Sequence, residues 1–138
     1  HVGLVVQSTV SEAVGEYRTA LRLRPEYTDA LANLGMALTL KGRAVEALPV
    51  FQKALELDSK NLKAAANLAA ALYDLGRFKE ASAAFARAVE IEPTDADLRY
   101  NLGLALQKAG RAEEARMAFR EAQRLDPKLK SPTATPPN

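Results

Sequence analysis

A spacing of 34 residues recurs through most of this 138-residue chain. Single residue types reappear at that step two or three times over, which chance does not produce in so many positions at once. Such a period is the signature of a small supersecondary unit that is stacked on copies of itself. The columns that carry it are Gly42, Gly76, Gly110; Leu34, Leu68, Leu102; Ala37, Ala71, Ala105; Ala13, Ala47, Ala81, Ala115; and Tyr17, Phe51, Phe85, Phe119.

Each unit is predicted to hold two helices with a glycine between them. Leu34 and Leu38 have helical spacing before Gly42, and Phe51 and Leu55 have it afterwards. Glycine at the junction allows the positive φ that ends many helices. A further column is expected to end the second helix, because proline cannot donate to a continuing helical ladder; it holds Pro25, Pro93 and Pro127, with Ser59 in the remaining copy.

The predicted fold class is therefore all-α, an α–α superhelix (solenoid) of about three and a half helix-turn-helix repeats. A partial repeat at 1–27 precedes full repeats at 28–61, 62–95 and 96–129. The last helix is expected to cap the stack, because Arg116, Arg120 and Gln123 stand where earlier copies are mostly less polar. The segment 130–138, rich in proline and poor in apolar residues, is expected to be a disordered tail.

These columns resemble the tetratricopeptide repeat, whose pattern has Leu-Gly, an aromatic residue, and then Gly, Ala, Phe or Tyr, Ala and Pro at these intervals. The resemblance covers about nine-tenths of the chain. It departs from the family where the early tryptophan is Leu31, Ala65 and Arg99, and where the first-helix tyrosine is Leu38, Leu72 and Leu106. It implies that the first helices line a concave inner face, and that the chain is a protein-interaction scaffold and not an enzyme.

One column of that inner face is invariant within the chain: Asn33, Asn67 and Asn101. An asparagine side chain has a donor and an acceptor, which match the two polar groups of a peptide bond. The series resembles the asparagine ladder in the superhelical domain of O-linked N-acetylglucosamine transferases, which implies a grip on an extended peptide backbone. The alternative is purely structural: the asparagines hydrogen-bond between neighbouring helices.

The resemblance also places other residues on the inner face. Met36, Tyr73, Tyr100 and Leu104 are candidate apolar anchors, since methionine and aromatic residues are common at binding surfaces, and each has a role in the core as its alternative. With Lys63 and the three asparagines they make up the predicted peptide-binding set. The remaining inner-face positions are Asp29, Ala32, Thr39, Leu40, Ala66, Ala70, Asp74, Asp97, Gln107 and Lys108.

Chaperone-type clamps for an acidic C-terminus are a poor match. Their five lysine, arginine and asparagine positions are Ala32, Met36, Asn67, Asp97 and Asn101 here, so only one is kept. Asp97 would also repel a carboxylate.

The residues for catalysis are missing from the pattern. His1 is the only histidine and there is no cysteine, so neither a histidine-based triad nor a thiolate metal site can be assembled. The glycines occur singly and not in a phosphate-binding loop. We therefore expect no enzyme activity, no cofactor and no metal.

The charge pattern bears on partners and location. The net charge of +2 comes from 19 basic and 17 acidic residues of mixed order, which disfavours nucleic acid. Basic residues near the C-terminal end are read as a solvated cap, with an anionic partner as the alternative. No apolar run is long enough for a membrane span. A cytoplasmic location is expected, with the periplasm left open.

Three functions follow from the pattern. The leading one is a scaffold that binds an extended or helical segment of a partner protein in a concave groove. The second is a structural protein that self-associates through its N-terminal end, where Val2, Leu4 and Val5 begin midway through a repeat. The third is the recognition arm of a larger enzyme, such as a glycosyltransferase.

Overall fold

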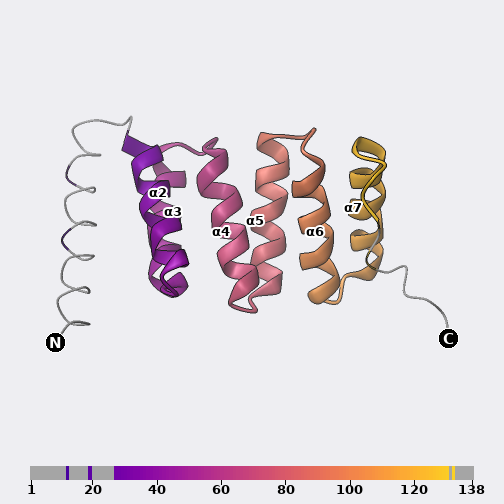
Figure 1. Ribbon diagram of the computed structural model, residues 1–138, viewed down its shortest axis with the longest axis horizontal. Coiled ribbons are helices and arrows are strands. Elements are labelled where there is room, and N and C mark those ends of the chain that lie inside the picture. The colour runs from indigo at the N-terminus through magenta and orange to yellow at the C-terminus, as the bar shows by residue number, and fades with distance from the viewer. Residues whose placement is uncertain (1–11, 13–18, 20–26, 131, 133–138) are drawn as a thin grey trace. The chain divides into compact units, whose positions relative to one another are not determined.

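The computed structural model describes residues 12, 19, 27–130 and 132, and this part of the chain is all-α (Figure 1). It divides into two compact units, His1–Asn67 and Leu68–Asn138, with the division inside α4. The predicted fold class and its three full helix-turn-helix repeats are confirmed. The three helix pairs are α2 (Thr28–Leu40) with α3 (Ala44–Leu57), α4 (Leu62–Asp74) with α5 (Phe78–Ile91), and α6 (Ala96–Lys108) with α7 (Ala112–Leu125).

The two ends of the chain fall almost wholly outside the described residues. This holds for the predicted partial repeat at 1–27, for self-association through its start, and for the predicted disordered tail at 130–138. Those expectations stay predictions.

The glycine between the helices of each pair ends the first helix in the same way all three times. Gly42, Gly76 and Gly110 have φ values of 78°, 78° and 83°. At the first turn, Arg43 N donates to Leu38 O at 2.9 Å and Gly42 N donates to Thr39 O at 3.0 Å, and the other two turns repeat both bonds. Paired bonds of this kind satisfy carbonyls that a helix end would otherwise leave without donors. The glycine period thus reflects one turn geometry used three times.

The second helix of each pair ends two residues before the proline column. α5 ends at Ile91 before Pro93, and α7 ends at Leu125 before Pro127. The first helices of the last two repeats start on a side-chain cap, because Asn61 Oδ1 accepts from Ala64 N at 2.9 Å and Asp95 Oδ1 accepts from Leu98 N at 3.1 Å. These caps satisfy backbone donors that have no partner inside the helix.

In the first unit, α2 packs on α3 around the ring of Phe51, which is completely buried. Gly35 of α2 makes this packing possible: a Cβ built there would lie 2.5 Å from Cε1 of the ring. Glycine inside a helix normally lowers its stability, so its presence at this position has a steric cause. The missing side chain at Gly35 therefore lets α2 pack closely on the ring of α3.

In the second unit, α6 packs on both α5 and α7, and the chain reverses direction at each turn (Figure 1). Gly103 and Phe119 repeat the earlier contact, again with 2.5 Å between a built Cβ and the ring. The core of the α6–α7 pair consists of Leu106, Ala115, Ala118 and Phe119.

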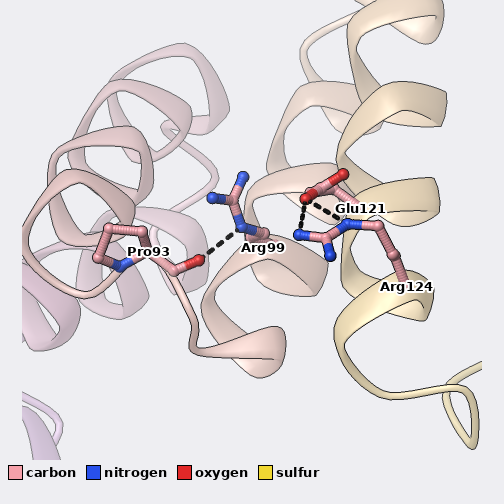
Figure 2. Close-up of polar contacts among 4 residues, drawn as sticks. All are labelled: Pro93, Arg99, Glu121 and Arg124. Atoms are coloured by element: carbon pink, nitrogen blue, oxygen red, sulfur yellow. Dashed lines mark hydrogen bonds and ion pairs between the residues drawn. The ribbon is translucent and has the colours of Figure 1, made fainter.

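Arg99 stands where the family has a tryptophan, and it binds backbone instead of packing a ring. Its Nε donates to the carbonyl oxygen of Pro93 at 2.9 Å, as Figure 2 shows. On the neighbouring α7, Arg124 donates to Glu121 through Nε and a terminal nitrogen. That hydrogen bonding holds the pKa of Glu121 below its ordinary value of 4.5, and the charge of Arg99 adds to the effect. A guanidinium group bonded to a backbone carbonyl therefore occupies the position of Arg99.

Candidate functional site

A pocket of about 190 Å³ lies within the second unit. α4 and α6 supply most of the lining residues, and α5 supplies Phe85. Tyr73, Phe85 and Leu104 give it an apolar lining, while Asp74 and Asn101 place a carboxylate and an amide in it. Pockets for whole small ligands are usually about 300–1,000 Å³, so this one has room for about one side chain. The full lining is Ala70, Tyr73, Asp74, Phe85, Asn101 and Leu104.

Both polar groups in the pocket are unused by the protein itself. Among the described residues, neither the Asp74 carboxylate nor the Asn101 amide has a hydrogen-bond or ion-pair partner, although the remaining helices carry several such pairs. Asp74 is exposed and Asn101 is half-buried. A half-buried amide with open hydrogen-bonding capacity can exchange water for a ligand at little cost.

The other two asparagines of the predicted ladder, both in the first unit, are already bonded. Asn33, exposed on α2, accepts from Lys63 Nζ at 3.1 Å, and Asn67 of α4 donates to Lys63 O at 2.8 Å. Close by, Asn61 donates to Asp29 at 2.6 Å and thereby ties the start of α4 to α2. The three asparagines therefore share a sequence column without sharing a hydrogen-bonding state.

The predicted apolar anchors also differ in their surroundings. Tyr73 and Leu104 line the pocket, and the Tyr73 ring makes a T-shaped contact with Phe78 at 5.1 Å between ring centres. The Tyr100 ring instead lies 5.4 Å from that of Phe119 and packs on the α6–α7 core, which favours its alternative role as a core residue.

Met36 is half-buried on α2, in the first unit. Ala32, expected on the inner face, is completely buried because its single methyl group is short enough for its neighbours to cover.

Phe85 is the one lining residue of the pocket that the sequence analysis did not place on the inner face. Its ring occupies the same column as Phe51 and Phe119, but its partner in the first helix is Ala69 and not glycine. A Cβ built at Gly35 would overlap the ring of Phe51, and one built at Gly103 would overlap the ring of Phe119. Because Ala69 has a Cβ, Phe85 must sit differently against Ala69 than the other two rings sit against glycine. In the sequence, the exchange of glycine for alanine at Ala69 is the sign that this repeat packs differently from the other two.

Among the described residues there is no group of three or more histidine, cysteine or acidic side chains placed to hold a metal ion. In the same part of the chain, no helix has the length and apolar character needed to cross a bilayer.

Comparisons with known proteins agree with this architecture. Family models described as "Tetratricopeptide repeat" match residues 4–61 and 96–129, and one described as "TPR repeat" matches 69–110. No curated protein matches the chain.

Among solved structures, the chain is similar to YrrB, "a TPR protein with an unusual peptide-binding site", at 30% identity over 90% of this chain and 64% of that one, with a TM-score of 0.69. MamA from Desulfovibrio magneticus RS-1 is 27% identical over 91% and 71%, with a TM-score of 0.72. The Yersinia enterocolitica translocator chaperone SycD, 19% identical over 75% and 78% with a TM-score of 0.68, shares the fold. With three repeat models matched along its length and these neighbours in structure, the chain belongs to the tetratricopeptide repeat proteins.

Proposed function

We propose that this protein is an interaction scaffold that binds an extended or helical segment of a partner polypeptide. The observation that carries the proposal is the pocket in the second unit, where open polar groups stand beside an apolar wall. Side-chain pockets of this kind fix one residue of a bound segment, while nearby polar groups fix its register.

Asn101 is the residue best suited to hold the backbone of that segment. Its amide has both a donor and an acceptor, so it can pair with the N–H and C=O of one peptide unit whatever side chain that unit carries. Asn33 and Asn67 would have to give up their bonds to Lys63 to do the same. The proposal therefore assigns the main backbone contact to Asn101 and a secondary one to the other two.

The similarity to YrrB supports the same function. That protein is described as having a peptide-binding site, and it shares 30% of its residues with this chain over the matched region.

Filling the pocket tests the proposal. Peptides would be selected from a random display library on the purified protein, and their affinities would be measured by fluorescence anisotropy. Ala70→Phe, which places a ring into the pocket from an exposed position, should weaken the selected peptides by about tenfold or more. Asn101→Ala should weaken them by a smaller factor, about threefold to tenfold, for one lost pair of hydrogen bonds.

A matched control separates the pocket from general effects of a larger side chain. Ala83 is exposed on α5 and does not line the pocket, so Ala83→Phe adds the same bulk elsewhere and should leave affinity unchanged. Selection that yields no binding peptide, or peptides indifferent to Ala70→Phe, would contradict the proposed function.

A further inference from the structure

The pocket combines a long apolar wall with a single acidic group at the end of a helix. Tyr73, Phe85 and Leu104 can cover an aliphatic stem, and Asp74 is the charged residue among the lining residues. Arginine and lysine have this construction, since they bury their methylene groups along apolar surface and keep the charge at the tip. We propose that the pocket selects a basic side chain of the bound segment, an inference that rests on the function proposed above.

The position of Asp74 strengthens the negative potential at the pocket. It is the last residue of α4, and a helix C-terminus carries a partial negative charge. Many helices place a basic residue in the last turn to offset that charge. Like α2, α3 and α5, α4 has none, whereas α6 has Lys108 and α7 has Arg124 in the last turn. The end of α4 is thus acidic without compensation from its own last turn.

Neighbouring cations do not neutralise Asp74. Arg77 lies three residues further on, across the turn at Gly76, and among the described residues no ion pair joins it to Asp74. Lys108, at the end of α6, also forms no ion pair among the described residues. The carboxylate therefore stays available to a cation from outside.

Tyr73 and Asn101 add to the preference. A cation over a tyrosine ring is attracted by the negative face of the ring, and the T-shaped contact with Phe78 helps to hold that ring in place. The Asn101 oxygen is an acceptor, which suits a group that has only donors. Arginine should be preferred over lysine, because its planar fork can reach the carboxylate and a second acceptor together. An acidic side chain would meet repulsion from Asp74.

The test selects random peptides in parallel on the wild-type protein and on Asp74→Asn, an exposed change of nearly equal size. Wild-type binders should share arginine or lysine at one position, and this enrichment should disappear on the variant. For one wild-type binder, anisotropy should show about a fivefold to twentyfold loss of affinity on Asp74→Asn. Replacing its basic anchor with norleucine should cost a similar factor on wild type and almost nothing on Asp74→Asn.

Glu90→Gln is the matched control for net charge, because Glu90 is exposed on α5 and does not line the pocket. It should leave affinity unchanged; an equal loss there would reduce the effect of Asp74 to general electrostatics and overturn the inference. Selected peptides that lose affinity on Ala70→Phe but carry an acidic or apolar anchor residue would overturn this inference. They would leave the proposed function intact. A selection with no binders at all would remove the proposed function with it.

Discussion

At the scale of single residues, glycine has two separate tasks in this chain. Gly42, Gly76 and Gly110 are needed for their backbone angles, and nothing lies within 4 Å of a Cβ built on them. Gly35 and Gly103 have the opposite reason, since a phenylalanine ring occupies the space of a Cβ. The two groups cannot be distinguished by residue type, and only the surrounding atoms in the structure separate them.

Replacing Gly76 isolates the backbone effect. Gly76→Ala should lower the free energy of unfolding by about 1–2 kcal/mol, because a left-handed conformation is sterically unfavourable for an L-residue with a side chain. Gly76→Asn should cost less, since asparagine tolerates that region better. Urea denaturation followed by circular dichroism measures both. Equal stability of Gly76→Ala and the native protein would show that the turn does not require a positive φ.

The ion pair of Glu121 with Arg124 predicts a dependence of stability on pH. The pKa of Glu121 lies below its ordinary value of 4.5 in the folded protein, chiefly through the hydrogen bond from Arg124. A carboxyl whose folded pKa is depressed contributes stability above its unfolded pKa, and that contribution disappears as the pH falls through the folded value. Glu121→Gln should therefore be slightly less stable than wild type near neutral pH, with the difference vanishing below 4.5. Urea midpoints measured across that range provide the comparison.

Arg124→Gln is the partner control for this effect. It should show the same small loss near neutral pH and the same convergence in acid, since either change removes the pair. A difference that grows as the pH falls would contradict the assignment, because the sign of the linkage would be reversed.

At the scale of helices, α3 contains a proline where the other second helices do not. Pro49 lies inside Ala44–Leu57 and cannot donate to the carbonyl of Val45, four residues earlier. Both residues are exposed, so water can reach the unpaired carbonyl. The cost of the proline is thereby reduced without being removed.

Pro49→Ala should stabilise the protein. Removing a proline from a helix interior improves helix propensity by about 3 kcal/mol. The unfolded chain gains conformational entropy without the proline, which reduces this stabilisation by about 0.4–1 kcal/mol. With the carbonyl solvated we expect a net gain of about 1–2 kcal/mol in thermal or urea unfolding. The repeat supplies the reverse experiment: Ala83 stands in the same column of α5, so Ala83→Pro should destabilise. A loss of stability on Pro49→Ala would mean that the proline supports the helix.

At the scale of the whole molecule, charge is balanced locally. Five ion pairs of the described residues each join side chains three apart on one helix or at its start. Pairing of this kind between exposed side chains is worth little to stability. The net charge of +2 and the mixed order of basic and acidic residues in the sequence disfavour the strong positive field that binding to phosphate backbones requires.

We therefore expect no useful affinity for nucleic acid. A fluorescently labelled DNA duplex should show no change in anisotropy at about 0.15 M salt with protein up to about 10 μM. Binding under these conditions that weakens steeply with added salt would contradict the prediction. It would then revive the alternative of an anionic partner for the basic C-terminal helix.

The sequence predicted the architecture far better than it predicted the site. The 34-residue period predicted the six helices and all three glycine turns, because these depend on local backbone geometry that each copy repeats. The family resemblance placed Tyr73, Asn101 and Leu104 on the inner face, and all three line the pocket. The role of a residue in one repeat can be assigned to its counterpart in another repeat only where the surrounding residues are also repeated.

The rest depended on contacts that differ between copies. Asn33 accepts from the side chain of Lys63, which has no lysine counterpart in the other repeats, whereas Asn67 donates to the backbone carbonyl of that residue, so the equal asparagines come to differ. The buried cap at Asn61 escaped notice because its column reads tyrosine, asparagine and aspartate in successive repeats. Tyr100 packs against Phe119 of α7, a contact that the sequence pattern does not describe.

All the walls of the pocket lie between Ala70 and Leu104, barely more than one period of the chain. A contiguous stretch of gene therefore encodes the entire pocket, and it carries its own glycine turn at Gly76. Recombination between repeat arrays that share this turn could copy or exchange the pocket as one cassette, without redesigning the helices around it. An array of this type can gain, lose or trade its binding preference in steps of a single unit.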